Sequence, residues 1–377
     1  MFLLKCLFFF FLLNNVYSDF NEAIYIKNLI GNGDYFIVND QSNTGLQSIK
    51  LNLAIHDKEI CGTNLYDNKE NIKTENFVKS KLHIEQKIMG GKKVKIAFEP
   101  WSVQIYYLNK FICGGTLVAR NYIMSAAHCI VENCHSSKVN KNDIQKLEVL
   151  INYPGDETSN FIDKTLEGFH LPNLRRRIRS ILLPSFSDSG NIQCQGENDF
   201  AILELDEYIP EGYGYACLPI FYPPMYTIYS SNFYIVGYGR NPYREERMMF
   251  NQNSFFQNNI EINNPFEYNE NKIQKLEVGV LITYPACRIK SSIPASKGYI
   301  CVYDKVDEGI CDGDSGSGLF IKHKDIESYQ QEQTILVGIV SKAASCLVGK
   351  DWVATNYQLY TDVFQHNNMY KKFFKNE

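Results

Sequence analysis

A series of short β-favouring runs, separated by turn residues, begins near residue 88 and constrains the fold more than any other feature. Runs of a few β-branched, aliphatic and aromatic residues bounded by turn residues are typical of strands. Their spacing predicts an all-β fold, either a sandwich or a pair of barrels. The clearest runs are 103–107, 115–118, 147–151, 200–205, 233–236, 276–282 and 335–340.

The composition is that of a globular protein. Apolar residues make up 45% of the 377 residues and charged residues 21%, which excludes a disordered, collagen-like or coiled-coil chain. The length is enough for two packing units. A formal net charge of -4 gives no global electrostatic reason to expect a nucleic-acid partner.

An apolar run at residues 3–13, with Lys5 near its start, predicts a signal peptide. It is too short to span the ~30 Å of hydrocarbon in a bilayer, and no later run reaches a spanning length. We expect cleavage after Ser18, so residues 1–18 are the signal peptide. The chain is then secreted and extracellular, with no membrane span, and disulfides can persist.

Eleven cysteines are present, and the predicted signal peptide contains one of them, Cys6. The remaining ten are even in number and allow five disulfides. Counting alone does not choose among the possible pairings.

Three other segments have a distinctive composition. Residues 19–87 are rich in Asn, Lys and Asp and have no clear helical period, so we expect a loosely folded segment. Residues 241–271, with nine Asn, and residues 322–333 are expected to be exposed loops. Apolar residues at helical spacing from 363 to 374 predict an amphipathic helix that docks on the body.

The motif with the most specific chemistry is the glycine-rich turn at residues 311–318, which contains Ser315. Its glycines allow a tight backbone that exposes the hydroxyl, and the N–H groups of Gly313 and Ser315 can converge on an oxyanion. A base is also needed, and His128 is flanked by small residues in the segment 125–129. Asp199, at the start of an apolar strand, is suited to orient that imidazole.

In this order, His128, Asp199 and Ser315, the chain resembles the trypsin/chymotrypsin-type serine proteases. The resemblance covers about residues 88–366. It is carried further by Ile88-Met89-Gly90-Gly91, Pro100-Trp101-Ser102-Val103, Cys113-Gly114-Gly115-Thr116-Leu117 and Gly237-Tyr238-Gly239.

The resemblance implies an all-β fold of two antiparallel six-stranded β-barrels packed together, with a C-terminal helix. The expected units are a propeptide at 19–87, a first barrel at 88–215 and a second barrel with the terminal helix at 216–377. It implies that His128 is the general base, that Asp199 orients it and that Ser315 is the nucleophile. No cofactor or metal is expected.

The resemblance also implies a zymogen. A trypsin-like protease would cleave after Lys87, and the new α-amino group of Ile88 would pair with Asp314. The remaining expected partners are protein or peptide substrates and protein inhibitors.

The implied disulfides use all ten cysteines. By position in the family they are Cys113 with Cys129, Cys287 with Cys301, Cys311 with Cys346, and Cys217 with Cys61, which leaves Cys134 with Cys194. The bridge at Cys61 would keep the propeptide tethered after cleavage.

The sequence departs from the family at the pocket that binds the substrate side chain. Gly309 stands where trypsin-like members carry Asp, so trypsin-like specificity is not expected. The segment Ser341-Lys342-Ala343 and the nearby Gln358 suggest a narrowed or polar pocket for small or apolar side chains, and Lys342 suggests an acidic group nearby. Ser317-Gly318 replaces the usual Gly-Pro after the nucleophile without removing a catalytic atom.

Other interpretations remain open. The altered pocket also fits a catalytically silent homologue that acts as an extracellular binding module. His128-Cys129 and Cys134-His135 suggest a zinc cluster, although disulfides explain those cysteines better in a secreted chain. The basic run 175–179 is either an anion-binding exosite, a processing site or the solvated edge of a strand.

Overall fold

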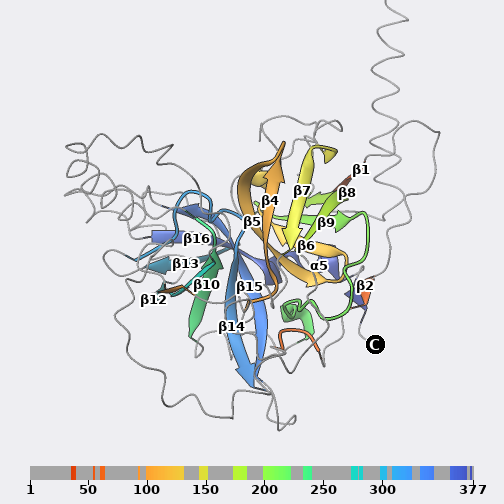
Figure 1. Cartoon of the computed structure of the whole chain (residues 1–377). Helices are drawn as coiled ribbons and strands as arrows, with labels where there is room; N and C mark the ends of the chain where they lie inside the picture. The colour runs from red at the N-terminus through yellow and green to blue at the C-terminus, as the bar shows by residue number, and fades with distance from the viewer. Residues whose placement is uncertain are drawn as a thin grey trace, which may run out of the picture.

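Strands dominate the structure, a computed structural model (Figure 1). It describes residues 35–39, 54–55, 60–63, 92–93, 99–130, 144–151, 173–184, 198–221, 232–239, 273–278, 280–282, 298–303, 308–324, 332–343, 357–371 and 374–375. The predicted signal peptide, the expected cleavage site at Lys87-Ile88 and the 241–271 segment lie outside these ranges.

The first sheet closes into a six-stranded antiparallel barrel in the order β8-β7-β4-β5-β6-β9. Closure depends on the long strand β8, which pairs with β7 over 174–177 and with β9 over 178–182. The strands are β4 (Ser102–Tyr107), β5 (Lys110–Ala119), β6 (Tyr122–Ser125), β7 (Leu147–Ile151), β8 (Leu174–Pro184) and β9 (Ala201–Leu205).

The second sheet is antiparallel, in the order β12-β13-β16-β15-β14-β10-β11-β3. β11 ends at Glu277 and β12 begins at Val280, so the two strands follow each other closely along the chain. Through β11 this run pairs with β10, and through β12 it pairs with β13. The strands are β3 (Lys92–Lys93), β10 (Phe233–Gly237), β11 (Gln274–Glu277), β12 (Val280–Ile282), β13 (Tyr299–Tyr303), β14 (Gly318–Lys324), β15 (Glu332–Ala343) and β16 (Tyr357–Asp362).

The predicted fold class is confirmed, and each of the seven predicted runs falls on a strand or a strand pair. The prediction of a loop at 322–333 is wrong at both ends of the segment, because β14 continues to Lys324 and β15 begins at Glu332. Cross-strand pairing and an ion pair between Lys322 and Glu332 extend this polar hairpin beyond its apolar part.

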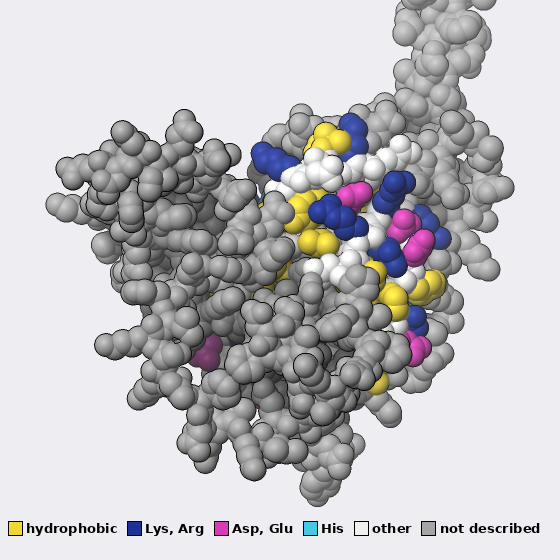
Figure 2. Space-filling view, viewed as in Figure 1, with side chains coloured by type: hydrophobic (Ala, Val, Ile, Leu, Met, Phe, Trp, Pro, Cys, Tyr) yellow, Lys and Arg dark blue, Asp and Glu magenta, His cyan; other side chains and the backbone are white. Residues whose placement is uncertain are grey.

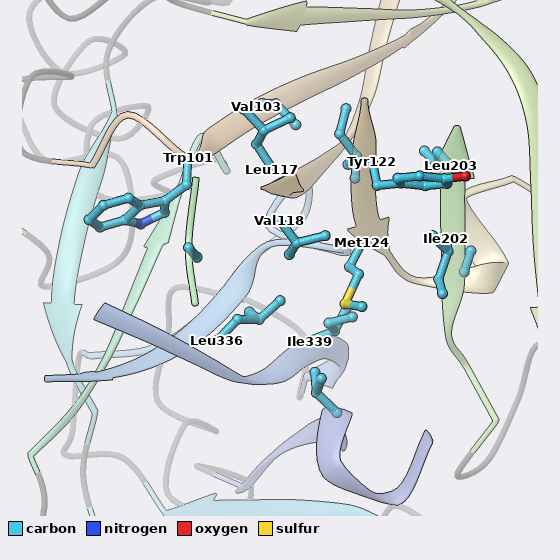
Figure 3. Packing of buried hydrophobic residues seen from close by; sticks show 14 of the residues in the cluster. Trp101, Val103, Leu117, Val118, Tyr122, Met124, Ile202, Leu203, Leu336 and Ile339 are labelled. Atoms are coloured by element: carbon cyan, nitrogen blue, oxygen red, sulfur yellow. The ribbon is translucent and has the colours of Figure 1, made fainter. Parts of the chain in front are cut away.

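One hydrophobic cluster joins the two sheets. Figure 3 shows Val103, Leu117 and Met124 of the first barrel together with Leu336 and Ile339 of β15. The alternation of side chains along each strand brings one face of both sheets into this core.

The C-terminal helix is shorter than predicted. A 3-10 turn, η7 (Val363–His366), leads into α5 (Asn367–Tyr370), and Phe374 lies in β17 (Phe374–Lys375) instead of the helix. Among the described residues, no helix has the length and apolar character that crossing a membrane requires.

The expectation that residues 19–87 fold loosely is wrong for the described parts of that segment. β1 (Tyr35–Asn39) pairs with 180–184 of β8, and β2 (Ala54–Ile55) pairs in parallel with β17. β7 pairs with β8 only as far as Arg177, and β1 pairs with the part of β8 that follows, residues 180–184. These strands depend on tertiary partners, which explains why no local sequence period indicates them.

The same segment is joined to the body by a disulfide between Cys61 and Cys217, the pairing that the resemblance implies. Beside it, the Gly62 N–H donates to Tyr215 O (2.7 Å), and the Thr334 N–H donates to Gly62 O (2.9 Å). A Cβ at position 62 would lie 2.3 Å from Thr334 O, and φ is +62°. Only glycine fits this close crossing.

The basic run lies on β8 and is interleaved with acidic side chains (Figure 2). Arg175 pairs with Glu148, Arg176 with Glu207, and Arg179 with Glu204. This neutralisation favours the interpretation of a solvated strand over that of an anion-binding exosite.

Replacing Cys61 and Cys217 together by Ser is expected to lower the free energy of unfolding of the precursor by about 2–4 kcal/mol, because the bridge closes a loop with a sequence separation of 156 residues. Urea denaturation without reductant measures this loss. An unchanged midpoint would contradict a stabilising role for the bridge.

Candidate active site

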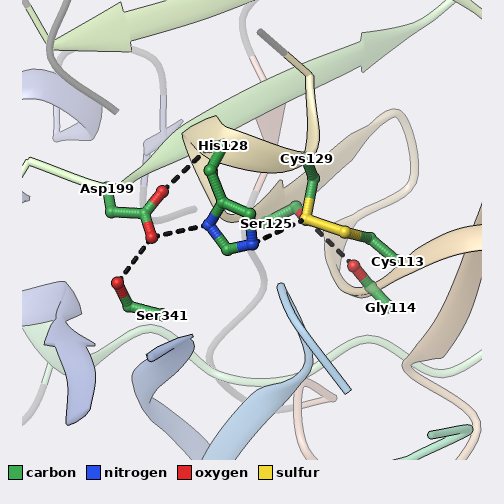
Figure 4. Close-up of a disulfide and its surroundings, with 7 residues drawn as sticks. All are labelled: Cys113, Gly114, Ser125, His128, Cys129, Asp199 and Ser341. Carbon is green, nitrogen blue, oxygen red and sulfur yellow. Dashed lines mark hydrogen bonds and ion pairs between the residues drawn. A yellow bond between two sulfur atoms is a disulfide. The ribbon is translucent and has the colours of Figure 1, made fainter. Parts of the chain in front are cut away.

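Asp199 and His128 form the centre of the site (Figure 4). His128 Nδ1 lies 2.7 Å from Asp199 Oδ2, and the His128 backbone N–H donates to Asp199 Oδ1 at 2.9 Å. An ionised carboxylate only accepts hydrogen bonds, so the neutral imidazole has its proton on Nδ1. The lone pair is then on Nε2, the arrangement that a general base requires.

The carboxylate of Asp199 is fully buried between the two sheets. Besides His128, it accepts a hydrogen bond of 2.5 Å from the hydroxyl of Ser341 on β15. The hydroxyl of Thr361 on β16 donates to the backbone oxygen of Asp199 at 2.9 Å. The first barrel therefore supplies the imidazole, and the second sheet supplies two hydroxyl groups.

The contact of Ser341 with Asp199 is not among the sequence predictions, which place this residue in the substrate pocket. Thr361 is not among them either. Neither has a local sequence signal, because both reach Asp199 from more than 140 residues away along the chain.

The turn that contains Ser315 is joined to the His128 segment through Gly114 of β5. The Gly114 N–H donates to Ser315 O at 2.8 Å, and Gly114 O accepts from Ser125 Oγ at 2.9 Å. A Cβ at Gly316 would lie 2.2 Å from Ser125 Oγ, so only glycine allows the two segments to lie so close.

Ser315 is partly exposed, as a nucleophile must be. Within the described residues, its hydroxyl makes no hydrogen bond with His128, whose Nε2 has Cys129 Sγ at 3.8 Å. The N–H groups of Gly313 and Ser315 likewise have no acceptor in the described part of the chain. In structures without substrate, such catalytic hydrogen bonds are often loose.

Ser317, where the family usually has Gly, fits inside the turn. Its N–H donates to Asp314 O at 3.0 Å, and its backbone oxygen accepts from Val340 N–H at 2.9 Å. The turn is therefore closed by backbone hydrogen bonds that do not depend on the residue type at this position.

Asp314 is a second fully buried carboxylate. It accepts hydrogen bonds from Gly239 N–H (2.7 Å) and Cys311 N–H (3.0 Å). A Cβ at Gly237 or Gly239 would lie 2.3 Å from its carboxylate atoms, which explains the glycines of the Gly-Tyr-Gly motif. Burial raises the pKa of Asp314 from 3.8 to about 7, against the opposing effect of the two hydrogen bonds.

The residues assigned to the substrate pocket lie at the end of β15 and on β16. Ala343 is paired directly opposite Gln358, and Lys342 opposite Leu359. Gln358 is only 4% exposed, and its side-chain oxygen accepts from Tyr360 OH at 2.9 Å. Gly309 is buried ahead of the Ser315 turn.

The zinc interpretation fails at His128-Cys129. Cys113 and Cys129 are joined in a disulfide, as the resemblance implies, so their sulfurs are not available as thiolate ligands. Cys301 and Cys311 are also disulfide-bonded. Cys134, Cys194, Cys287 and Cys346 lie outside the described residues.

Replacing Asp314 by Asn is expected to change how the stability of the precursor depends on pH. Since the pKa is raised on folding, folding favours the protonated carboxyl, and its contribution to stability is lost as pH rises from about 4 to about 7. The free energy of unfolding of Asp314→Asn relative to wild type should therefore rise over this range by up to about 4 kcal/mol. Urea titrations at several pH values measure it.

The control for that experiment is Asp206→Asn, since Asp206 is an exposed carboxylate that follows β9 in the first barrel. Its difference from wild type should change little with pH. A pH-independent difference for Asp314→Asn would show that burial does not perturb this carboxyl.

Comparison with known proteins agrees with this geometry. The sequence profile of the Trypsin family matches residues 88–164 and 175–369. Over 298 residues the chain is 25% identical to Trypsin-like protease try-5 of Caenorhabditis elegans, covering 73% of this chain and 82% of that protein.

Shorter matches include Kallikrein 1-related peptidase b16 of Mus musculus, 43% identical over 51 residues, and Glandular kallikrein of Sus scrofa, 34% identical over 77 residues. The first covers 14% of this chain and the second 19%; they span only 20% and 31% of those proteins. The profile match extends over most of the chain, and the chain therefore belongs to the trypsin family.

Proposed function

We propose that the protein is a secreted serine endopeptidase that is made as a zymogen. The observation that carries the proposal is the buried Asp199 carboxylate, hydrogen-bonded twice to His128 beside the turn of Ser315. The apolar N-terminal run and the disulfides support secretion.

The chemistry follows from the positions of the protons. His128 Nε2 takes the proton of the Ser315 hydroxyl while Ser315 Oγ attacks the scissile carbonyl carbon. Asp199 stabilises the resulting imidazolium, and the N–H groups of Gly313 and Ser315 stabilise the tetrahedral oxyanion.

His128 then gives its proton to the leaving amine, and the acyl group remains on Ser315. A water molecule, deprotonated by His128, then attacks the acyl carbonyl carbon. The bond to Ser315 Oγ breaks, the acid leaves, and His128 returns the proton to Ser315 Oγ. These residues complete the reaction without a cofactor.

Asp314 supports the zymogen part of the proposal. It is buried, and within the described residues it has backbone donors but no cationic partner. Cleavage after Lys87 would free the α-amino group of Ile88, and pairing of this cation with Asp314 would lower the raised pKa. The Ser315 turn would then be fixed around an ionised carboxylate.

The pocket argues against trypsin-like specificity. Gly309 offers no carboxylate to a basic side chain, and the buried, hydrogen-bonded Gln358 lies opposite Ala343. We propose that small or apolar residues precede the scissile bond, with Lys342 favouring acidic groups nearby.

Ser315→Ala is expected to abolish labelling by a fluorophosphonate, because the nucleophilic oxygen is lost. The secreted precursor is treated with trypsin, its new N-terminus is sequenced, and wild type and variant are labelled in parallel. The precursor before cleavage should label weakly. A clean Ile88 terminus without labelling of wild type would contradict the protease and favour the silent binding module.

A peptide library that varies the residue before the scissile bond is expected to show cleavage after small or apolar residues and little after Arg or Lys. Gln358→Gly should widen the pocket and increase cleavage after larger side chains relative to small ones. The ratio of kcat/KM values measures both effects. A wild-type preference for Arg would overturn the pocket assignment.

A further inference from the structure

Five aromatic side chains form a continuous series behind Asp199, here called the aromatic ladder. His366 stacks on Phe200 with ring centroids 4.5 Å apart, and Tyr370 lies 6.4 Å from the same ring. Phe374 lies 6.1 Å from Tyr370 and 5.5 Å from Tyr122. All five side chains are buried.

The aromatic ladder reaches both segments that position the Asp199–His128 pair. Tyr122 begins β6, which ends at Ser125 just before His128. Phe200 follows Asp199 directly, and its N–H donates to Asn198 O at 2.7 Å, closing a tight turn around Asp199. A displacement of the Phe200 ring is therefore transmitted to Asp199.

Phe374 is held by the N-terminal segment. It pairs with Ala54 in the parallel pair β17–β2, and β2 is the one strand partner of β17 within the described residues. Two residues per strand make a weak pair by themselves. The Cys61–Cys217 disulfide keeps β2 close by, so the pairing is effectively intramolecular.

We propose that Phe374 is a positioning residue for Asp199, and that the N-terminal segment, through β2, holds it in place before and after activation. The segment would thus be a permanent part of the catalytic structure and not only a removable inhibitor. The predicted effect of Phe374 on kcat rests on the proposed function. Its predicted effect on the Asp199–His128 hydrogen bond does not.

The physical reason is alignment. The hydrogen bond of 2.7 Å between Asp199 and His128 Nδ1 requires the carboxylate to stay in one position behind the imidazole. A misplacement of about 1 Å in catalytic geometry can cost about 10²-fold in rate. The residues proposed to bind the substrate side chain, Gly309, Lys342 and Gln358, are not part of the aromatic ladder, so KM should change little.

The test compares Phe374→Leu with Phe233→Leu, a matched control that removes a similarly buried ring at the start of β10 in the second sheet. Two readouts are used: the downfield proton resonance of His128 Nδ1–H in precursor and activated protein, and kcat and KM after activation. For Phe374→Leu we expect a shifted or broadened resonance, a fall in kcat of about 10–100-fold and a KM within about twofold of wild type. Phe233→Leu should leave all three unchanged.

A second variant, Ile55→Pro, is designed to break the β2 backbone pairing while all five residues of the aromatic ladder stay unsubstituted, and it should reproduce both effects. It also serves if Phe374→Leu does not fold. An unchanged resonance and kcat in a folded variant would overturn the proposal. If activated wild type has no activity but the variants shift the His128 Nδ1–H resonance, the result would contradict the proposed function and support the positioning role.

Discussion

The buried carboxylate of Asp199 is the interaction on which the rest of the site depends. Removing a carboxylate from water is costly unless hydrogen bonds replace the lost hydration. Here the donors come from both sheets: the backbone N–H and Nδ1–H of His128 on one side and the hydroxyl of Ser341 on the other. The pair of sheets must therefore pack in one arrangement for this charge to be stabilised, and that arrangement brings His128 to the turn of Ser315.

Asp314 is a second buried carboxylate, with a different set of donors. It is equally buried, but its two donors are backbone N–H groups, and burial outweighs them and raises its pKa. Asp199 thus has donors on both sides that are permanent parts of the fold, whereas Asp314 still favours a further cation. We interpret this difference as the physical basis of the proposed zymogen, in which one carboxylate orders the base permanently and the other orders the nucleophile's turn on cleavage.

Much of this arrangement is predictable from local patterns. Three local patterns indicate the candidate residues: small residues around His128, glycines around Ser315 and an apolar strand after Asp199. The structure brings His128 and Asp199 into hydrogen-bond contact. Other features have no local pattern. Strand β2 has two residues, the hydroxyls of Ser341 and Thr361 meet Asp199 only after the sheets pack, and Phe374 leaves the predicted helix because β2 pairs with it. Such features depend on tertiary contacts, which a periodicity does not encode. The roles of Lys87, Ile88 and the pocket residues stay predictions.

The most direct measurement of the central claim is the rate at which Ser315 is acylated by an active ester in activated Asp199→Asn, compared with wild type at neutral pH. An Asn side chain can donate to His128 Nδ1 and so favour the wrong tautomer. We predict a fall of about 10⁴-fold with the fold intact, the loss expected when the imidazole is held in the wrong tautomer. An acylation rate within about tenfold of wild type would contradict the claim that the buried carboxylate prepares His128 as the base.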